Sequence, residues 1–442
     1  MNIILLSGGS GKRLWPLSND VRSKQFLKIF RKADGTKESM AMRMYRMIKE
    51  IDPDSTVTIA TSENQIPQIR AQLGDNVGIS VEPTRRDTFP AISLATAYLK
   101  KQGVSVDEPV VVCPVDPYVE SDYFECLKEL SDAAGEETAA NLTLMGIEPT
   151  YPSEKYGYII PTSKNHIASV SEFKEKPDKE TAEKYIEKGA LWNGGVFAFK
   201  LSYVLGIAKE IFDTDSYDEL FAKYETLQKI SFDYAVVEKE KSINVIRFPG
   251  SWKDLGTWNT LTEAMDELVS GNAVAEGCYN THVINELEIP LIALGIKNAV
   301  ITATPDGILV SDKEKSPELK NFVADSRPMY ERRSWGEYKV LDYKRHTDEQ
   351  TSLTKELIIN AGQHISYQRH QHRTEIWTFT EGTGELIVDG EVKEVHRGDV
   401  AVIKPETKHA IKAVDGELHI IEVQIGNELT EDDIERLDWD WE

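Results

Sequence analysis

Three glycines, a lysine and an arginine directly follow the first apolar run of this chain, in the stretch LSGGSGKRLWPLS (6–18). Glycine lets a backbone approach a polyphosphate closely, and the N–H groups that such a turn exposes attract anions. The cations Lys12 and Arg13 would balance the phosphate charge. The stretch predicts a phosphate-binding turn, and the alternative is a glycine-rich turn with solvated basic residues.

Two familiar phosphate loops do not fit this spacing. A P-loop needs Ser or Thr after Gly11-Lys12 and a glycine five residues before Gly11, but Arg13 and Leu6 stand there. A dinucleotide-binding fingerprint needs a third glycine at the position of Leu14. What remains is a strand followed by Gly8, Gly9 and a third glycine within a basic segment.

A second set of potential ligands lies near the other end of the chain, where six of the nine histidines fall between residues 364 and 419. His370 and His372 are two residues apart, so on a strand their side chains would point to the same side. Glu375 and His409, the latter from a neighbouring strand, can complete the set. Imidazole plus carboxylate suits Zn, Fe, Ni or Mn, which predicts a divalent transition metal here.

The composition narrows the class of protein. The chain has 442 residues, enough for two or three domains, and a net charge of −23 that disfavours nucleic acid and anionic membranes as partners. Cys113, Cys126 and Cys278 are odd in number and far apart, which argues against a disulfide framework. The apolar run IILL is too short for a signal peptide or a membrane span, so we expect a cytoplasmic protein.

The elements that must position these residues change in character along the chain. Apolar runs at 2–6, 56–61 and 109–116, with a helical pattern at 91–103 between the last two, predict a wound, mostly parallel α/β sheet over 1–268. Short strands and turns then predict a small β module with a linker over 269–330.

Closely spaced β runs with glycine turns predict an antiparallel barrel or jelly roll over 331–426, with a hairpin at VDGEV (388–392). The last segment, 427–442, holds eight acidic residues and one arginine. We expect this tail to be a solvated acidic helix or partly disordered.

A series of motifs in the first 325 residues resembles the sugar-1-phosphate nucleotidyltransferases, and within them most closely the mannose-1-phosphate guanylyltransferases. The motifs follow one another in the family's order: GGSGKRLWPLSNDVRSKQFLKI (8–29), EPTRRDTFPAI (82–92), VDPYVES (115–121), YGYI (156–159), FKEKPD (173–178), LWNGGVFAF (191–199), SFDYAVVEK (231–239) and WKDLGTW (252–258). The resemblance implies a Rossmann-like, GT-A-like domain that uses GTP, mannose-1-phosphate and Mg²⁺.

The same resemblance implies roles for individual residues. Asp116 and Asp254 would hold Mg²⁺, and Arg13 and Lys24 would act on the triphosphate, so these four form the catalytic set. The nucleotide-binding set adds Leu6, Ser7, Gly8, Gly9, Gly11, Lys12, Glu82 and Arg86. The sugar-phosphate set is Gly157, Glu175, Lys176 and Asn193. Without the family context, each aspartate could also be a turn or a helix cap, and the charged run around Lys176 could be solvated.

Three positions depart from the family pattern. Ser23 stands where proline is usual, Asp87 stands where asparagine is usual, and Pro117 stands where the aspartate is usually followed by histidine. The catalytic set is retained, while the base and the sugar stay open.

Residues 334–437 resemble the type II phosphomannose isomerase domain, a cupin, through GQHISYQRHQHRTEIW (362–377), GTGELIVDG (382–390) and IEVQIGNELTEDDIERL (421–437). Lys355 and Gln368 match family positions. Ile376 replaces a family histidine, and the chain ends in LDWDWE without the family's basic finish. Both changes should weaken phosphate binding, so the barrel is either an isomerase or a metal-stabilised module that assembles or regulates.

The leading hypothesis is thus an enzyme that makes GDP-mannose and pyrophosphate, with a homodimer left open. One alternative transfers another nucleotide or uses another hexose or heptose phosphate, with a non-catalytic cupin. The other is a non-catalytic sugar-nucleotide sensor, although a sensor would have no need to keep the catalytic set.

Overall fold

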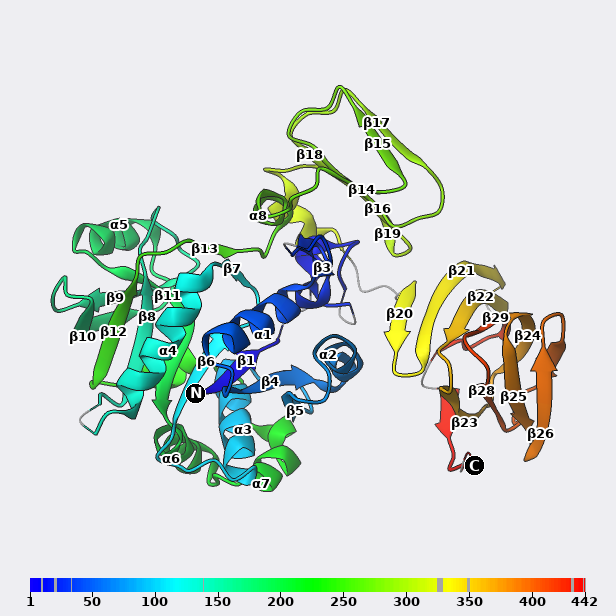
Figure 1. Ribbon diagram of the computed structural model, residues 1–442, viewed down its shortest axis with the longest axis horizontal. Coiled ribbons are helices and arrows are strands. Elements are labelled where there is room, and N and C mark those ends of the chain that lie inside the picture. Colours follow the sequence, from blue (N-terminus) through cyan, green and yellow to red (C-terminus); the bar gives the residue numbers. More distant parts are fainter. Residues whose placement is uncertain are drawn as a thin grey trace. The chain divides into compact units, whose positions relative to one another are not determined.

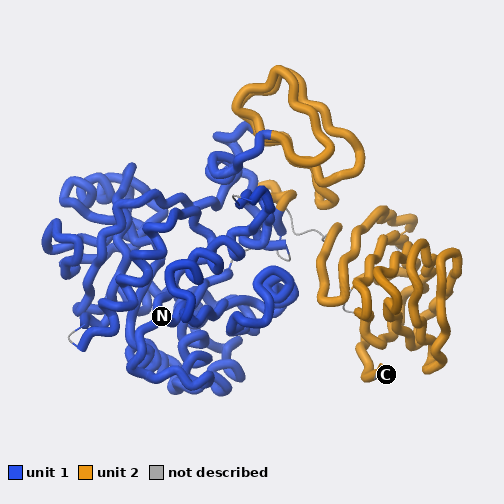
Figure 2. The backbone as a smooth tube through the Cα atoms, viewed as in Figure 1, with its two compact units in different colours: residues 1–14, 18–268, 312–320 blue, residues 15–17, 269–311, 321–442 orange. Residues whose placement is uncertain are grey.

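A computed structural model describes residues 1–8, 11–19, 22–32, 34–137, 139–323, 329–347, 350–430, 433–439 and 441 (Figure 1). The chain forms two compact units, shown in different colours in Figure 2. Unit 1 comprises residues 1–14, 18–268 and 312–320. Unit 2 comprises residues 15–17, 269–311 and 321–442.

A nine-stranded sheet forms the centre of unit 1, in the order β5-β4-β1-β6-β11-β8-β12-β10-β9. The apolar runs at its centre are fully buried, as expected of strands covered on both faces. Its strands are β1 (Asn2–Leu6), β4 (Thr56–Ser62), β5 (Gly78–Glu82), β6 (Pro109–Pro114), β8 (Leu142–Ile147), β9 (Gly157–Pro161), β10 (Ile167–Lys174), β11 (Leu191–Lys200) and β12 (Ile243–Phe248).

Helices cover both faces of this sheet (Figure 1). Helices α3 and α6 pack onto the face that carries Ile4 and Val112, while α4 contacts β6, β8 and β11. The helices are α1 (Met40–Ile51), α2 (Ile66–Leu73), α3 (Thr88–Lys101), α4 (Ser121–Gly135), α5 (Lys179–Glu187), α6 (Leu201–Phe212), α7 (Tyr217–Ala222) and α8 (Trp258–Glu263).

Strand β1 lies where the chain reverses its direction across the sheet. The chain runs from β1 outward through β4 and β5, then returns to β6 on the other side of β1, and all four strands are parallel. Such a switch point opens a crevice at the carboxyl ends of the two strands that flank it. The glycine turn follows β1 and Asp116 follows β6, so both lie at this crevice.

The half of the sheet beyond β6 is mixed, whereas the sequence predicts a mostly parallel sheet. Strand β11 runs antiparallel to β6 and β8, and β10 runs antiparallel to β9 and β12. A buried strand carries the same apolar run in either direction, so the pattern does not report strand direction. Two short ribbons complete the unit: β2 (Phe30–Arg31) with β3 (Lys37–Glu38), and β7 (Pro117–Val119) with β13 (Trp252–Asp254).

The expected β module in unit 2 is a short coil of parallel strands. Strands β14, β16 and β18 stack in parallel in one sheet that ends with β19, and β15 pairs in parallel with β17 in another. Their bounds are β14 (Val269–Gly271), β15 (Ala273–Glu276), β16 (His282–Asn285), β17 (Leu291–Leu294), β18 (Ala299–Thr304) and β19 (Gly307–Asp312).

Antiparallel strands of the same unit form two facing sheets with the apolar side chains packed between them. The predicted hairpin is present: β25 pairs with β26, and Asp389 and Gly390 between them have φ of 48° and 88°. The strands are β20 (Tyr330–Arg333), β21 (Gly336–Thr347), β22 (Gln350–Ile359), β23 (His364–His370), β24 (Arg373–Glu381), β25 (Thr383–Val388), β26 (Glu391–His396), β27 (Val400–Ile403), β28 (His409–Ala413), β29 (Leu418–Gly426) and β30 (Ile434–Arg436).

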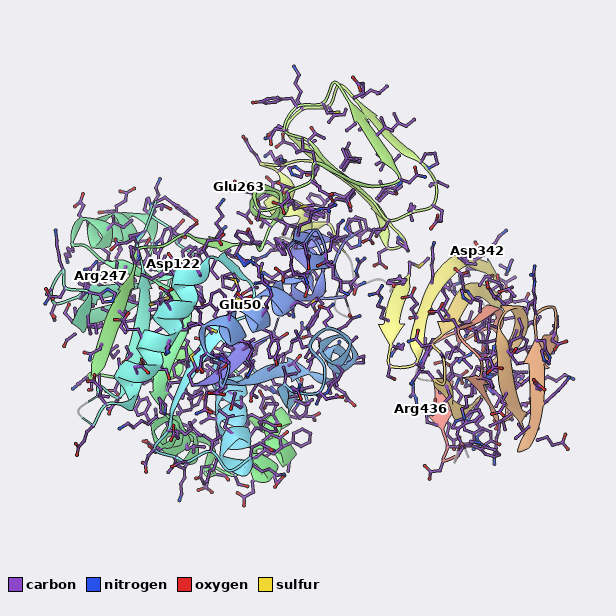
Figure 3. The ribbon with its side chains drawn as sticks, in the orientation of Figure 1. Glu50, Asp122, Arg247, Glu263, Asp342 and Arg436 are labelled. Carbon is purple, nitrogen blue, oxygen red and sulfur yellow. The ribbon has the colours of Figure 1, made fainter. Side chains whose placement is uncertain are left out.

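The acidic tail differs from its expected solvated or disordered state. Strand β30, whose last residue Arg436 is labelled in Figure 3, pairs with β23. Beyond it, Trp439 packs against Tyr367 and Trp441 packs against His364, with ring centroids 5.0 and 5.2 Å apart. Packing of these half-buried tryptophan rings and the strand pairing offset the charge repulsion that the composition suggests.

Within the described ranges, no helix combines the length and the apolar character needed to cross a membrane.

Candidate functional site

The ribbon of β7 and β13 brings together two aspartates that are far apart in the sequence. Asp254 lies opposite Pro117 in this antiparallel pair, and Pro117 follows Asp116 directly. The ammonium group of Lys24 reaches both carboxylates: its Nζ lies 2.6 Å from Asp116 Oδ2 and 3.9 Å from Asp254 Oδ1. Three segments of the chain therefore converge at the crevice beside β1 and β6.

Lys24 keeps its charge in this position. Burial lowers the pKa of Lys24, but the charges of Asp116 and Asp254 and the hydrogen bond to Asp116 together raise it by more, so the net pKa lies above its usual value. The side chain is 19% exposed. A lysine that is desolvated yet charged is suited to contact a phosphate group.

A buried hydrogen-bond network holds the segment that carries Lys24. Gln25 Nε2 donates to Ser7 Oγ at 2.9 Å, and Ser7 Oγ donates to Gln65 Oε1 at 3.0 Å. Gln65 Nε2 in turn donates to Ser23 Oγ at 2.8 Å. Ser23 stands where the family has proline. Its hydroxyl accepts a hydrogen bond that a proline side chain could not accept. The network ties the residues flanking Lys24 to the residue that follows β1.

The glycine turn has the backbone freedom that its sequence predicts. Gly11 has φ of 61°, a conformation that favours glycine, and a Cβ there would lie 3.0 Å from Ser18 Oγ. Ser18 Oγ donates to the Gly11 carbonyl at 2.6 Å. A Cβ on Gly8 would meet nothing within 4 Å, so the space beside this backbone is open. Gly9 lies outside the described residues.

The remaining residues of the turn connect it to the aspartates. The carbonyl of Leu6 accepts a hydrogen bond from Val115 N at 3.1 Å, just before Asp116. Lys12 and Arg13 form one helical turn, Lys12–Leu14, and the charge of the exposed Arg13 acts on Lys24. Arg13, one of the predicted phosphate-contacting cations, therefore lies within electrostatic range of Lys24.

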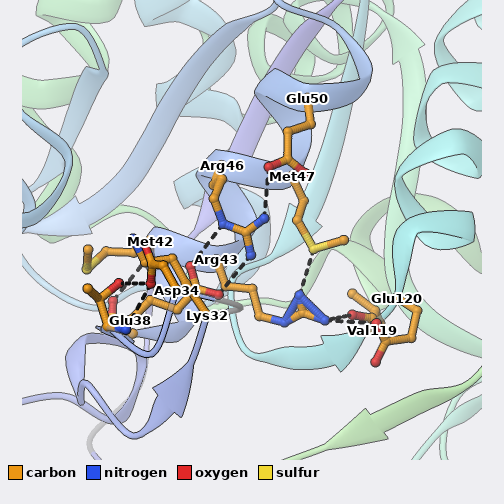
Figure 4. Close-up of polar contacts among 12 residues, drawn as sticks. Lys32, Asp34, Glu38, Met42, Arg43, Arg46, Met47, Glu50, Val119 and Glu120 are labelled. Carbon is orange, nitrogen blue, oxygen red and sulfur yellow. Dashed lines mark hydrogen bonds and ion pairs between the residues drawn. The ribbon is translucent and has the colours of Figure 1, made fainter.

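Arg43 of α1 holds the end of strand β7 through hydrogen bonds to Val119 and Glu120 (Figure 4). Its Nη2 donates to the Val119 carbonyl at 2.7 Å and to Glu120 Oε2 at 3.1 Å, and its guanidinium lies 4.9 Å from the centroid of the Tyr118 ring. Arg43 is buried. Because Val119 ends β7, this arginine restrains the strand that starts beside Asp116.

The predicted nucleotide residues Glu82 and Arg86 meet one short segment after α7. Tyr224 OH donates to Glu82 Oε2 at 2.6 Å, and Arg86 Nη2 donates to the Glu225 carbonyl. Burial raises the pKa of Glu82 to about 7, and the Tyr224 hydrogen bond counteracts part of this effect. Glu82 ends β5, at the same edge of the sheet as Asp116.

Gly157, Glu175 and Lys176 form a second group. A Cβ on Gly157 would lie 2.5 Å from Glu175 Oε2 and 2.8 Å from Phe173 Cζ, so any larger residue there would displace both side chains. Lys176 Nζ lies 2.5 Å from Glu175 Oε1, and Lys176 has the rarely populated φ of 44°. Non-glycine residues in this conformation are concentrated at binding sites.

Asn193 pairs with Gly157 across β11 and β9, and its amide reveals a residue that the sequence analysis missed. Asn193 Nδ2 donates to Asp233 Oδ1 at 2.7 Å. Burial raises the pKa of Asp233 to about 6, and the charge of Glu175 adds to the effect. Asp233 opens a π-helical turn, Asp233–Val237, a feature often found at functional sites. The motif SFDYAVVEK contains this residue, and its buried polar position was the missing signal.

A separate cluster lies in the barrel of unit 2, which is formed by the two facing sheets of strands β20 to β30. His370, Glu375 and His409 each present a ligand atom, and these atoms lie within 4.8 Å of one another, with all three side chains at most 1% exposed. Among the described residues, both ring nitrogens of His370, Glu375 Oε2 and His409 Nε2 find no hydrogen-bond partner. His409 Nδ1 donates to the Thr407 carbonyl at 2.9 Å, which leaves Nε2 as the lone-pair nitrogen.

The structure does not bring His372 into this cluster. Strand β23 ends at His370, so residues 371 and 372 form a turn and the alternation of a strand no longer applies. The His372 side chain is 43% exposed, and its Nδ1 lies 2.7 Å from Asp433 Oδ1.

Ile376 does not face the cluster either. Its neighbours Glu375 and Trp377 point into the barrel and are buried, and side chains alternate along a strand, so position 376 faces away from the cluster. The replacement of the family histidine by Ile376 therefore removes no ligand from the cluster of His370, Glu375 and His409.

Both clusters fit the metals that the fold implies. Oxygen ligands of Asp116 and Asp254 are the type that Mg²⁺ prefers, whereas two imidazoles and a carboxylate suit a transition metal. The orphaned buried atoms of His370, Glu375 and His409 would gain the partner they lack. Buried polar atoms without partners are costly, so a bound cation would stabilise the barrel.

The fold and the two clusters define an enzyme class: a wound α/β nucleotide-binding transferase unit followed by a cupin barrel. Residues 2–271 match the family model described as Nucleotidyl transferase, and residues 324–439 match the model described as Mannose-6-phosphate isomerase C-terminal. The first match covers more than half of the chain, which therefore belongs to the nucleotidyl transferase family.

Known proteins resemble the chain over nearly its whole length. Mannose-1-phosphate guanylyltransferase RfbM of Salmonella typhimurium strain LT2 is 30% identical, over 98% of this chain and 96% of the relative. Xanthan biosynthesis protein XanB of Xanthomonas campestris pv. campestris strain B100 is 29% identical, over 98% and 97%. The crystal structure of a "mannose-1-phosphate geranyltransferase" from Thermus thermophilus superimposes with a TM-score of 0.61 at 28% identity, over 73% of this chain and 97% of that chain.

The raised pKa of Asp233 predicts a pH dependence of stability. The pKa rises from 3.8 to about 6 on folding, so the stabilisation is fully present below pH 4 and is lost as the pH rises through 6. The difference corresponds to up to about 3 kcal/mol. Asp233→Asn keeps the acceptor for Asn193 but cannot ionise, so its unfolding free energy should fall less than the parent's between pH 4 and 7.

Urea unfolding at several pH values measures this difference, and the unchanged barrel cancels in the comparison. Asp107→Asn, at an exposed aspartate of the same unit, serves as the matched control. Parallel profiles for Asp233→Asn and its parent would show that Asp233 does not titrate as described.

Loss of the Arg43 hydrogen bonds to Val119 and Glu120 should lower both the free energy of unfolding and the kcat of the nucleotidyl transfer. Arg43→Leu leaves the Val119 carbonyl without its side-chain donor, which should cost about 1–3 kcal/mol of unfolding free energy. Arg43→Lys keeps the charge but not the planar fork, so an intermediate loss is expected. Urea midpoints and kcat check both, and wild-type values for Arg43→Leu would contradict the role.

Proposed function

We propose that unit 1 transfers GMP from GTP to mannose-1-phosphate, with GDP-mannose and pyrophosphate as products, and that it works in the cytoplasm. The convergence of Asp116, Asp254 and Lys24 beside the glycine turn carries this proposal. Full-length relatives named mannose-1-phosphate guanylyltransferase support the choice of substrates. They do not favour another nucleotide, another sugar phosphate or a non-catalytic sensor.

Charge neutralisation is the main task, because both substrates are anions. Mg²⁺ held by Asp116 and Asp254 would neutralise charge on the triphosphate. The open space beside the Gly8 backbone would admit the phosphates, and Lys12 would bind them. Arg13 and the charged Lys24 contact the α-phosphate and stabilise the charge that builds there in the transition state.

The reaction forms one bond and breaks one. A phosphate oxygen of mannose-1-phosphate attacks the α-phosphorus of GTP, and the bond from this phosphorus to the bridging oxygen breaks as pyrophosphate leaves. Lys176 would hold the phosphate of the sugar, and Glu175, Asn193 and Asp233 would accept or donate hydrogen bonds at its hydroxyl groups. Holding the two reactants in line supplies much of the rate enhancement.

Glu82 supports guanine as the base. Guanine presents two adjacent donors, N1–H and the 2-amino group, which match the two oxygens of a carboxylate. Tyr224 OH orients this carboxylate through its 2.6 Å hydrogen bond. Adenine lacks this pair of donors, so Glu82 would select against ATP.

For the barrel we propose a divalent transition metal held by His370, Glu375 and His409. Isomerisation of mannose-6-phosphate is a second candidate activity, because Lys355 on β22 lies opposite the buried Glu422 on β29 in the same barrel. Such a pair can bind a sugar phosphate and move a proton between C1 and C2. Conversion of mannose-6-phosphate to fructose-6-phosphate tests this candidate.

A substrate panel tests the main proposal. Pyrophosphate release is measured with each of the four NTPs and with mannose-1-phosphate, glucose-1-phosphate or a heptose-1-phosphate. We expect GTP with mannose-1-phosphate to give the highest kcat/KM. A higher kcat/KM with another pair of NTP and sugar phosphate would replace the assigned substrates. If no pair released pyrophosphate, the proposal that unit 1 is a nucleotidyltransferase would be wrong.

Asp254→Ala should reduce turnover by at least about 10³-fold while the fold persists, because one of the two carboxylates beside Lys24 is lost. Asp107→Ala, at an exposed aspartate of the same unit, should retain wild-type turnover. The same pyrophosphate assay and a circular dichroism spectrum provide the readouts. Substantial turnover in Asp254→Ala would remove this residue from the catalytic set.

A further inference from the structure

Strand β30 runs directly beside the histidine cluster of the barrel. In the antiparallel pair of β30 and β23, Ile434 lies opposite His370 and Arg436 lies opposite Gln368. The preceding residue, Asp433, therefore reaches the turn that joins β23 to β24. This turn is short, and it connects two of the three clustered side chains, His370 and Glu375.

The Asp433 carboxylate closes this turn with three contacts. Its Oδ1 accepts a hydrogen bond from Gln371 N at 3.0 Å, and its Oδ2 accepts one from His372 N at 3.3 Å. His372 Nδ1 lies 2.7 Å from Oδ1 as well. The Asp433 side chain is only 1% exposed, although an acidic residue in such an acidic segment would ordinarily face solvent. A buried carboxylate on two successive backbone N–H groups fixes the path of a turn.

Arg373 transmits this restraint to Glu375. Its Nη1 lies 3.6 Å from Asp433 Oδ2 and donates to the Thr430 carbonyl at 3.0 Å. Its Nε donates to Glu375 Oε1 at 2.8 Å. Glu375 Oε1 also accepts a hydrogen bond from Gln424 Nε2 at 3.2 Å and lies 3.4 Å from His370 Nε2. Glu375 Oε2 faces His409 Nε2 at 3.5 Å.

We propose that Asp433 is a positioning residue for the metal site of the barrel, acting on His370 through the turn and on Glu375 through Arg373. The inference rests on the proposed metal ligands and assigns β30 and its flanking residues a part in metal binding. Asp433 also offsets the positive charge of Arg373, which would otherwise oppose a divalent cation next to Glu375. Groups that orient metal ligands in this way typically change metal affinity by about 10- to 100-fold.

The tail beyond β30 keeps the strand in place. Trp439 packs on Tyr367, and Lys412 Nζ lies 5.5 Å from the centroid of the Trp441 ring. On the outer side of the strand, Arg369 Nε donates to Glu435 Oε2 at 2.7 Å. Glu435 therefore offers a control on the same strand, since its carboxylate faces solvent rather than the cluster.

Cobalt titration of the full-length protein tests the inference. The protein is stripped with a chelator and titrated with Co²⁺, whose visible absorption bands report the ligand geometry. Asp433→Asn should weaken Co²⁺ affinity by about 10- to 100-fold and alter the bands, because the ligands lose their orientation. Glu435→Gln should match the wild type, and His370→Ala should bind no Co²⁺ in the barrel.

The outcomes separate the two proposals. No barrel-specific Co²⁺ binding by the wild type would overturn the metal site and this inference with it. Wild-type affinity and bands in Asp433→Asn would overturn the positioning role alone. Near-UV circular dichroism verifies that the barrel is folded. If Asp433→Asn does not fold, Asp433→Glu, which keeps both oxygens and the charge, should fold and bind with reduced affinity, and wild-type affinity in that variant would contradict the inference.

Discussion

An ammonium group held between two carboxylates is the contact on which the rest of unit 1 depends. Lys24, Asp116 and Asp254 come from three distant parts of the chain, and like charges on the two aspartates would separate them without a cation between them. The switch point of the sheet places the first aspartate, and the β7–β13 ribbon places the second. Substrate phosphates and a divalent cation would enter a site whose charges are already arranged around this contact.

The two units use the same means to hold reactive groups in place. In unit 1, the uncharged network of Ser7, Gln25 and Gln65 fixes the residues on both sides of Lys24. In the barrel, Arg373 and Asp433 fix the residues around Glu375. In both cases the supporting groups are buried and lie behind the group that would meet the ligand. The positions of Lys24 and Glu375 are therefore set by buried hydrogen bonds to residues from several segments of the chain.

Residue types and spacing were sufficient to predict the glycine turn, the main strands of unit 1, the hairpin and the grouping of His370, Glu375 and His409. The roles of Lys24, Asp116 and Asp254 were expected only from the family resemblance, because on spacing alone either aspartate could be a turn or a helix cap. Asp233 was not predicted, because its importance arises from packing against Asn193 across the sheet. The grouping of His372 with the ligands assumed a strand that in fact ends two residues earlier. The tail was expected to be solvated because its acidic composition outweighed its two tryptophans. Strand direction beyond β6 was also hidden, since hydrophobic patterns carry no polarity. Local patterns thus predict elements, whereas contacts between distant segments decide which polar residues matter.

The order of the strands along the chain has a consequence for biosynthesis. Strand β30 follows every other strand of the barrel in the sequence, yet it pairs with β23, one of the earlier ones. During translation β30 can therefore pair beside His370 only after its residues have left the ribosome. Unit 1, by contrast, has all of its sequence available by residue 320. The sequence of unit 1 is therefore complete before the proposed metal site of the barrel can gain its last strand, and loading of that metal would be a late event in maturation.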